Sequence, residues 1–168
     1  MAPSTPQGRL NAALQKLSNN PAGSAQRFYA LGEAAKESFE VGNKEDARKY
    51  ANELLTLAPS FPGDWNYGNA IHDGNMVLGQ IALREGKMDE AKSLLLKAGT
   101  SPGSPQMNSF GPNMSLARDL LAKGEKETVI QYFGECRVFW AMGHDQLDQW
   151  TKDAKAGRQP DFGANLLY

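Results

Sequence analysis

Three glycines organise this chain. Gly42, Gly86 and Gly124 each follow a stretch with apolar residues at helical spacing, and each precedes a short charged opening and a second such stretch. A small residue lies seven positions before each glycine and another small or β-branched residue lies five positions after it, which allows two helices to approach closely. These positions hold Ala35, Gly79 and Ala117 before the glycines, and Ala47, Ala91 and Val129 after them. The pattern predicts three helix–turn–helix units.

The second unit carries the most specific motif, which consists of Leu78-Gly79, Gly86, Ala91 and a closing Pro102. This set resembles the tetratricopeptide repeat (TPR), a helical hairpin of about 34 residues. The resemblance implies an all-α fold of antiparallel helical hairpins, stacked as a short TPR-like solenoid of about eight helices. The turn glycines lie 44 and 38 residues apart, so about ten and about four residues are inserted between the units.

We expect a single domain, because 168 residues suffice for one hydrophobic core and are few for two. Apolar residues before and after the units predict a helix at each end that caps the array. The expected order is a leading helix at 6–19, repeat units at about 28–61, 72–102 and 110–140, a capping helix at 144–156 and a C-terminal tail at 157–168.

Composition excludes several classes of function. The formal charge is −1, so no basic excess indicates a nucleic acid or a membrane surface as the partner. Cys136 is the only cysteine and there are two histidines, so we expect no disulfide, no metal site and no cofactor. No apolar run approaches the roughly 20 residues that span a bilayer. We expect a soluble, cytoplasmic protein.

The two inserted segments, 60–76 and 100–114, are rich in aromatic and amide side chains, and long loops on a helical frame often carry binding residues. Aligned on the turn glycines, Asn75 and Asn113 occupy the same position, and a methionine follows each. Two interpretations stay open. Either both asparagines cap the first turn of a helix, which Pro112 favours, or they line a polar pocket.

The tail residues 162–166 repeat the Phe-Gly-x-Asn order of 110–114 and add Asn165 to the same set. His72 precedes Asp73, and such a pair forms either a base, for which no nucleophile is identifiable, or a hydrogen-bonded structural histidine. Trp65 either covers a hydrophobic edge or walls a pocket. Cys136 lies twelve residues after Gly124, where the other units place Leu54 and Ala98, and is expected in the core. Trp140 and Trp150 fall on apolar stripes and are expected there too.

The leading hypothesis is a non-catalytic binding or scaffold module. As the resemblance implies, a peptide or protein segment would bind in the groove formed by the first helix of each unit. Those helices offer Tyr29, Lys36, Asp73, Met76, Gln80, Met114 and Arg118.

The alternative is a small-molecule receptor or an enzyme, in which the two inserted segments and the tail form a polar pocket around His72, Asp73, Asn75 and Asn113. A third hypothesis is a repeat segment of a larger assembly, and the sequence does not indicate an oligomeric state. Over these hypotheses the candidate binding residues are His72, Asp73, Asn75, Met76, Gln80, Phe110, Asn113, Met114, Arg118, Trp65 and Asn165.

Overall fold

The computed structural model describes residues 5–167 and is all-helical over that range. The nine α-helices of the described chain are α1 (Pro6–Ser18), α2 (Ala25–Glu40), α3 (Lys44–Leu57), α4 (Tyr67–Arg84), α5 (Met88–Gly99), α6 (Pro105–Phe110), α7 (Ser115–Ala122), α8 (Lys126–Cys136) and α9 (His144–Lys155). Three short 3-10 turns are η1 (Ala58–Ser60), η2 (Ala141–Gly143) and η3 (Gly163–Leu166). The short helix α6 lies within the second inserted segment, where the sequence predicted a loop.

The three predicted hairpins form around the three turn glycines. Gly42, Gly86 and Gly124 adopt positive φ angles of 85°, 76° and 88°. At each turn, the amide of the residue after the glycine donates a hydrogen bond of 2.9–3.0 Å to the carbonyl five residues earlier. This bond closes the helix end in the same way three times, because glycine accepts the left-handed conformation without a steric penalty.

The small residues of the pattern lie where helices come closest. A Cβ atom added to Gly79 would lie 2.5 Å from a methyl carbon of Leu116 and 3.2 Å from the Cβ of Leu94. Ala91 and Val129, which follow the turns, are fully buried. The spacing therefore indicated close contacts between helices correctly.

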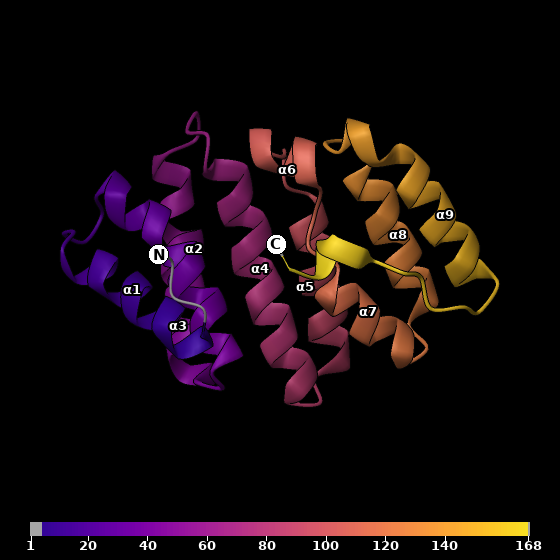
Figure 1. Cartoon of the computed structure of the whole chain (residues 1–168), viewed down its shortest axis with the longest axis horizontal. Coiled ribbons are helices and arrows are strands. Elements are labelled where there is room, and N and C mark those ends of the chain that lie inside the picture. Colours follow the sequence, from indigo (N-terminus) through magenta and orange to yellow (C-terminus); the bar gives the residue numbers. More distant parts are fainter. Residues whose placement is uncertain (1–4, 168) are drawn as a thin grey trace.

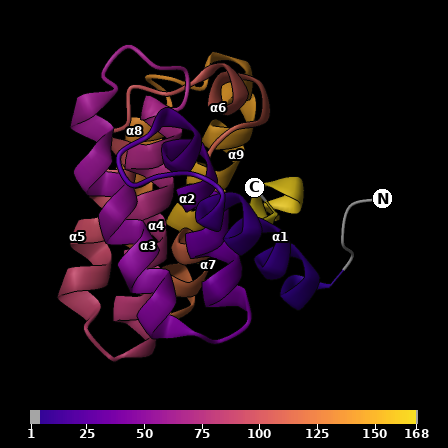
Figure 2. The same cartoon turned by 90° about the vertical axis from the view of Figure 1, so that its left-hand side faces the viewer.

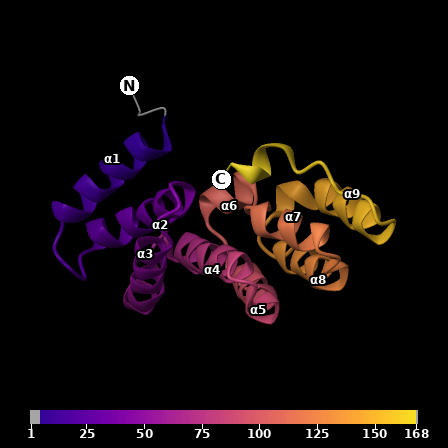
Figure 3. The same ribbon diagram turned by 90° about the horizontal axis from the view of Figure 1, so that it is seen from below.

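The helices form a curved row with two layers (Figures 1 and 3). Helices α2, α4 and α7 lie toward the inner side of the curve, and α3, α5 and α8 lie toward the outer side. Figure 2 shows α1 and the C-terminal segment on the inner side, opposite α5. The first helix of each hairpin thus contributes to one shared face.

Apolar residues from neighbouring hairpins join in the core. Cys136, Trp140 and Trp150 are buried, as predicted. The Trp150 indole meets the Phe162 ring edge-on at 5.0 Å, and its Nε1 donates to the Asp161 carbonyl at 2.9 Å. Both rings also lie near that of Phe133 in α8, at 6.0 Å from Trp150 and 6.1 Å from Phe162, so helix α9 and the tail pack on the third hairpin.

Helix α4 begins at Tyr67, five residues before the predicted start of the second unit at 72. Gly68 and Gly74 within this stretch weaken its helical pattern, which is why the sequence suggested a loop. Both are required for close packing. An added Cβ would lie 1.8 Å from the Gly103 carbonyl oxygen at Gly68 and 2.6 Å from Leu55 Cγ at Gly74. Asn75 consequently lies more than two turns inside α4, and the interpretation of Asn75 as a helix cap is wrong.

Candidate functional site

The two inserted segments pack against each other at one edge of the inner face. Asn69 joins them through two hydrogen bonds, because its Nδ2 donates to Gln106 Oε1 at 2.6 Å and its Oδ1 accepts from Ser104 Oγ at 2.6 Å. The buried Ser101 hydroxyl donates to the Gly68 carbonyl at 2.6 Å. These contacts hold α6 beside the start of α4.

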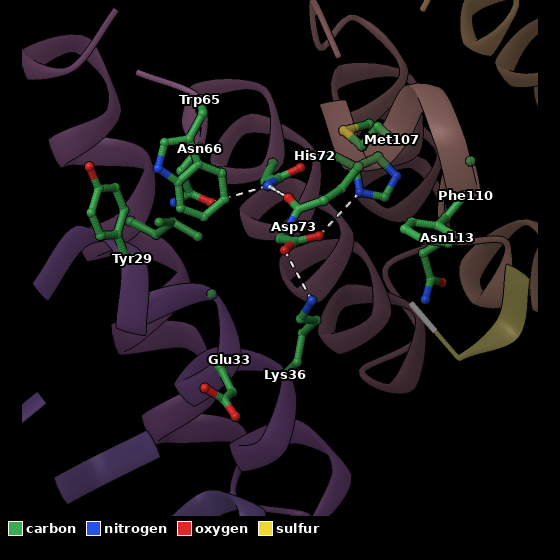
Figure 4. Close-up of a pocket in the computed structure, with 16 residues that line it drawn as sticks. Tyr29, Glu33, Lys36, Trp65, Asn66, His72, Asp73, Met107, Phe110 and Asn113 are labelled. Atoms are coloured by element: carbon green, nitrogen blue, oxygen red, sulfur yellow. Dashed lines mark hydrogen bonds and ion pairs between the residues drawn. The ribbon is translucent and has the colours of Figure 1, made fainter. Parts of the chain in front are cut away.

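A cavity of about 430 Å³, the upper cavity, opens between α2, the start of α4 and α6. Figure 4 shows Tyr29 and Trp65 on one side of it, and Met107 and Phe110 on the other. The full lining is Tyr29, Gly32, Glu33, Lys36, Leu54, Trp65, Asn66, Asn69, Ala70, His72, Asp73, Gln106, Met107, Phe110, Gly111 and Asn113. The predicted residues Trp65, His72, Asp73, Phe110 and Asn113 are all brought together here.

The rim of the upper cavity is aromatic and accessible. Tyr29, Trp65 and Phe110 are 37%, 49% and 57% exposed. The Tyr29 and Trp65 rings lie 5.2 Å apart, and the Tyr29 hydroxyl donates to Asp64 Oδ2 at 2.6 Å. Of the two interpretations of Trp65, the structure supports the one in which it walls a cavity.

A chain of polar contacts, the polar relay, runs from the cavity into the core, and Figure 4 shows its links from Lys36 to Asp73 and from Asp73 to His72. Lys36 Nζ donates to Asp73 Oδ2 at 3.1 Å, and Asp73 Oδ1 lies 3.3 Å from His72 Nδ1. His72 Nε2 lies 3.2 Å from the Tyr132 hydroxyl, which donates to the Asn113 carbonyl at 2.8 Å. The relay connects α2, α4 and α8 with the segment before α7.

Asp73 is ionised within this relay. Burial by itself would raise the pKa of its carboxyl group, but the Lys36 ammonium and the hydrogen-bonded His72 ring outweigh burial and hold that pKa well below its ordinary value. The same pairing raises the pKa of the Lys36 ammonium. The Lys36–Asp73 ion pair therefore forms part of the lining of the upper cavity.

His72 is not placed to act as a general base. His72 Nε2 lies 3.2 Å from the Tyr132 hydroxyl, which itself donates to the Asn113 carbonyl, and Nδ1 lies 3.3 Å from Asp73 Oδ1. Both ring nitrogens are thus within hydrogen-bonding distance of groups of the protein itself. His72 is also only 3% exposed. None of the described residues lining the upper cavity is Ser, Thr or Cys, and burial raises the pKa of the Cys136 thiol in the core.

A second cavity of about 680 Å³, the lower cavity, continues from the first along the inner face. It is lined by Arg9, Glu33, Lys36, Glu37, Phe39, Glu40, Asp73, Met76, Val77, Gln80, Asn113, Ser115, Leu166 and Leu167. Glu33, Lys36, Asp73 and Asn113 line both cavities. The two cavities are therefore adjacent, and together they are called the groove below; the predicted residues Met76 and Gln80 line its lower part.

Asn75 and Asn113 do not converge. Asn75 is almost buried, lines neither cavity and donates from Nδ2 to the Ile71 carbonyl at 2.8 Å. Asn113 lines both cavities, and its Oδ1 accepts from the Ser115 amide at 2.8 Å, at the start of α7. Asn113 thus lines a pocket and bonds the first residue of α7, but the N-cap of α7 is Met114, without a side-chain cap hydrogen bond. Asn75 lines neither cavity and lies inside α4.

Three other predicted residues lie outside the groove because the C-terminal segment covers α7. Met114 is fully buried, and its amide donates to the Asn165 carbonyl at 2.8 Å. Asn165 lines neither cavity and donates from Nδ2 to the carbonyls of Phe110 and Pro112 at 3.0 and 3.1 Å. Arg118 pairs with the adjacent Asp119, and its carbonyl accepts from Gln159.

Sequence reasoning missed the acidic residues of the groove. Glu33, Glu37 and Glu40 recur at intervals of three and four residues along α2, as residues on one helical face do. This spacing could have identified them, but a charged stripe on a helix usually faces solvent.

Within residues 5–167, no group of three or more His, Cys, Asp or Glu side chains is arranged to bind a metal ion. No helix in the same range is long and apolar enough to cross a membrane. Comparisons with protein-family models, with curated proteins and with solved structures found no match to this chain. Its function has to be inferred from the chemistry of the groove itself.

Proposed function

We propose that this chain is a TPR-like, non-catalytic binding module that holds a peptide or protein segment in the groove. The three hairpins close with the same turn, and their first helices share the inner face, as expected for a short solenoid. A groove across several helices suits an extended or helical segment.

The observation that carries the proposal is where apolar surface is left exposed. Among the described residues, six large apolar side chains are exposed, and four of them line the groove. These four are Tyr29, Trp65, Phe110 and Leu167. Since exposed apolar groups in a patch favour association, the groove is the part of this surface most suited to a partner.

The C-terminal segment supports a polypeptide ligand. Residues 161–167 lie along the inner face and are held there by main-chain and amide hydrogen bonds, such as the bond from the Met114 amide to the Asn165 carbonyl. The same face thus already accommodates one stretch of backbone beside the open groove.

The test is selection of random linear peptides displayed on phage against the purified chain, followed by calorimetry of the selected peptides. We expect peptides whose affinity falls at least about tenfold for the Trp65→Ala/Phe110→Ala double variant, because buried aromatic anchors carry much of the free energy of such interfaces.

The matched control is Val138→Ala/Met142→Ala, which removes the two exposed apolar side chains outside the groove. This control should bind the peptides as the unchanged protein does. Failure to enrich any peptide, or equal weakening by the two double variants, would overturn the proposal.

A small-molecule receptor is a second candidate, supported by the upper cavity alone. Its volume of about 430 Å³ is within the usual range for small ligands, and Asn66 and Gln106 line it with amide groups beside aromatic walls. His72 and Asp73 would act in it through charge and shape, since both are held in the polar relay.

A thermal-shift screen with small polar molecules tests this candidate. A true ligand should raise the melting temperature of the unchanged protein and lose that effect in Gly32→Leu, which places a side chain at the cavity wall. A ligand that stabilises both proteins equally binds elsewhere and counts against the receptor.

A further inference from the structure

The lower cavity is acidic. Four carboxylates line it, from Glu33, Glu37, Glu40 and Asp73, against the two cations Arg9 and Lys36. Two negative charges therefore remain in excess within the cavity, whereas the whole chain of 168 residues has a formal charge of only −1. The lining of the lower cavity is therefore more acidic than the chain as a whole.

The existing ion pairs leave part of this charge without a strong partner. Lys36 pairs with Asp73 at 3.1 Å, and Arg9 Nε pairs with Glu37 Oε1 at 2.7 Å. The other carboxylate oxygen, Glu37 Oε2, is buried and has no hydrogen-bond partner within the described chain. A buried acceptor of this kind gains most from a donor that a ligand supplies.

Glu33 and Glu40 are the more accessible carboxylates. Glu33 pairs with Lys16 at 2.7 Å, but the two side chains are 41% and 57% exposed, and such surface pairs contribute little and exchange readily. Glu40 is exposed at the end of α2, and within residues 5–167 it forms no ion pair. A cation entering the groove can therefore meet both without breaking a buried contact.

The upper cavity, in contrast, favours an apolar part of the same ligand. Its exposed rim is aromatic, and Glu33 lies at the junction of the two cavities. The Trp65 and Tyr29 rings can bury an apolar side chain or the stem of a long basic one. The groove thus combines an apolar end with an acidic end.

From this charge complementarity we propose that the segment bound in the groove is a basic peptide. An apolar side chain of the peptide occupies the upper cavity, and a lysine or arginine beside it faces Glu33, Glu37 and Glu40 in the lower cavity. This inference rests on the proposed binding of a polypeptide. Arginine suits the site best, because its planar guanidinium donates to more than one carboxylate at once.

The test uses the peptides selected on the unchanged protein. They should be enriched in arginine or lysine next to an apolar residue, and raising the salt concentration should weaken their binding. In Glu33→Gln/Glu40→Gln the affinity should fall about tenfold. This double variant should still fold, because both side chains are accessible. Removing the negative charge of Glu40 also removes its unfavourable interaction with the dipole at the C-terminal end of α2.

The control is Glu45→Gln/Glu127→Gln, which removes the same charge from exposed positions on α3 and α8 outside both cavities. Its affinity for the peptides should stay within about twofold of the unchanged protein. In addition, replacing the basic residue of a peptide by glutamine should weaken binding to the unchanged protein and have little further effect on Glu33→Gln/Glu40→Gln.

The outcomes separate the two proposals. Peptides that depend on Trp65 and Phe110 but lack basic residues, or that bind Glu33→Gln/Glu40→Gln normally, would overturn the basic-peptide inference and leave the binding module standing. Peptides weakened equally by the acidic-groove variant and its control would also overturn the inference. Absence of any groove-dependent peptide would overturn both.

Discussion

The hairpin turns and the inserted segments use glycine in opposite ways. At Gly42, Gly86 and Gly124 the backbone has a positive φ, and an added Cβ would meet no atom within 4 Å. At Gly68 the surrounding space is filled, since an added Cβ would lie 1.8 Å from the Gly103 carbonyl oxygen. The turn glycines serve local backbone geometry, and Gly68 serves contact between distant segments.

This difference separates the frame of the molecule from its candidate site. Each turn is closed by bonds between residues five apart, so it depends on its own hairpin. The upper cavity depends on contacts such as Asn69 with Gln106, 37 residues apart. Damage to the turns should therefore cost modest stability, and damage to the joined segments should cost both stability and the site.

Gly68→Ala should have the largest effect. The new methyl group would overlap backbone that cannot move aside easily, so we expect a loss of about 3 kcal/mol or more in the free energy of unfolding. Urea denaturation measures this. The control is Gly134→Ala in α8, where an added Cβ meets nothing within 4 Å, and alanine should raise stability by up to about 1 kcal/mol. Equal stability of the two variants would refute the close packing of the segments.

Asp73→Asn should follow, with a loss of about 2 kcal/mol at neutral pH, because it removes a mostly buried charge from the Lys36 pair. The folded-state pKa of Asp73 is lowered, so its contribution is present above the unfolded-state value of about 4 and is lost as the pH falls through the folded-state value. The stability difference between the two proteins should therefore shrink in acid.

Unfolding free energies measured across that pH range check this prediction. Asp148→Asn is the control, since its pair with Arg137 is exposed and should contribute less than about 1 kcal/mol. A difference for Asp73→Asn that stays constant from neutral to acid pH would contradict the ionised relay.

Gly86→Ala should cost about 1 kcal/mol, because alanine must adopt a left-handed conformation in open space. Gly86→Asn should cost less, since asparagine tolerates that conformation better. Alanine at Gly42 and at Gly124 should cost a similar amount. A much larger loss at one of the three turns would show that the hairpins are not equivalent in stability, and thermal unfolding distinguishes these outcomes.

Trp65→Ala should have the smallest effect on stability, within about 0.5 kcal/mol, because half of the side chain is exposed. Its effect on selected peptides should be a loss of about tenfold or more in affinity. Paired calorimetry and denaturation measure both quantities. A large loss of stability with unchanged affinity would assign Trp65 to covering the hydrophobic edge.

Features determined by short-range pattern were predictable. Helices α1 and α9 lie close to the predicted ranges 6–19 and 144–156, and the turn glycines end their helices as expected. The buried position of Trp150 followed from helical periodicity, and that of Cys136 followed from its alignment with Leu54 and Ala98 in the other units. Trp140 is buried as predicted, but it lies between α8 and η2 and not on a helix. These features depend on spacing within one helix or one hairpin.

Features determined by contacts between distant residues were predicted in part. Trp65 and Asn113 were selected because they lie in the inserted segments, and the structure places both at the upper cavity. Asn75 was selected because it aligns with Asn113 on the turn glycines. In the structure α4 already begins at Tyr67, and Asn75 lies inside this helix, bonded to the Ile71 carbonyl and outside the groove. Met114 was expected in the groove but is fully buried, and its amide donates to the Asn165 carbonyl of the tail.

By itself, the sequence determined the all-α class, the three turns and most of the core, since each arises from local conformational preference and from periodic burial of apolar residues. Only the tertiary structure decided which side chains form the site. Glu33 on α2, Asp73 on α4 and Phe110 on α6 share a groove because Gly68 and Gly103 allow the inserted segments to meet and the tail covers α7. Contacts of this kind depend on how helices far apart in the chain pack against each other, and no local sequence pattern specifies that packing.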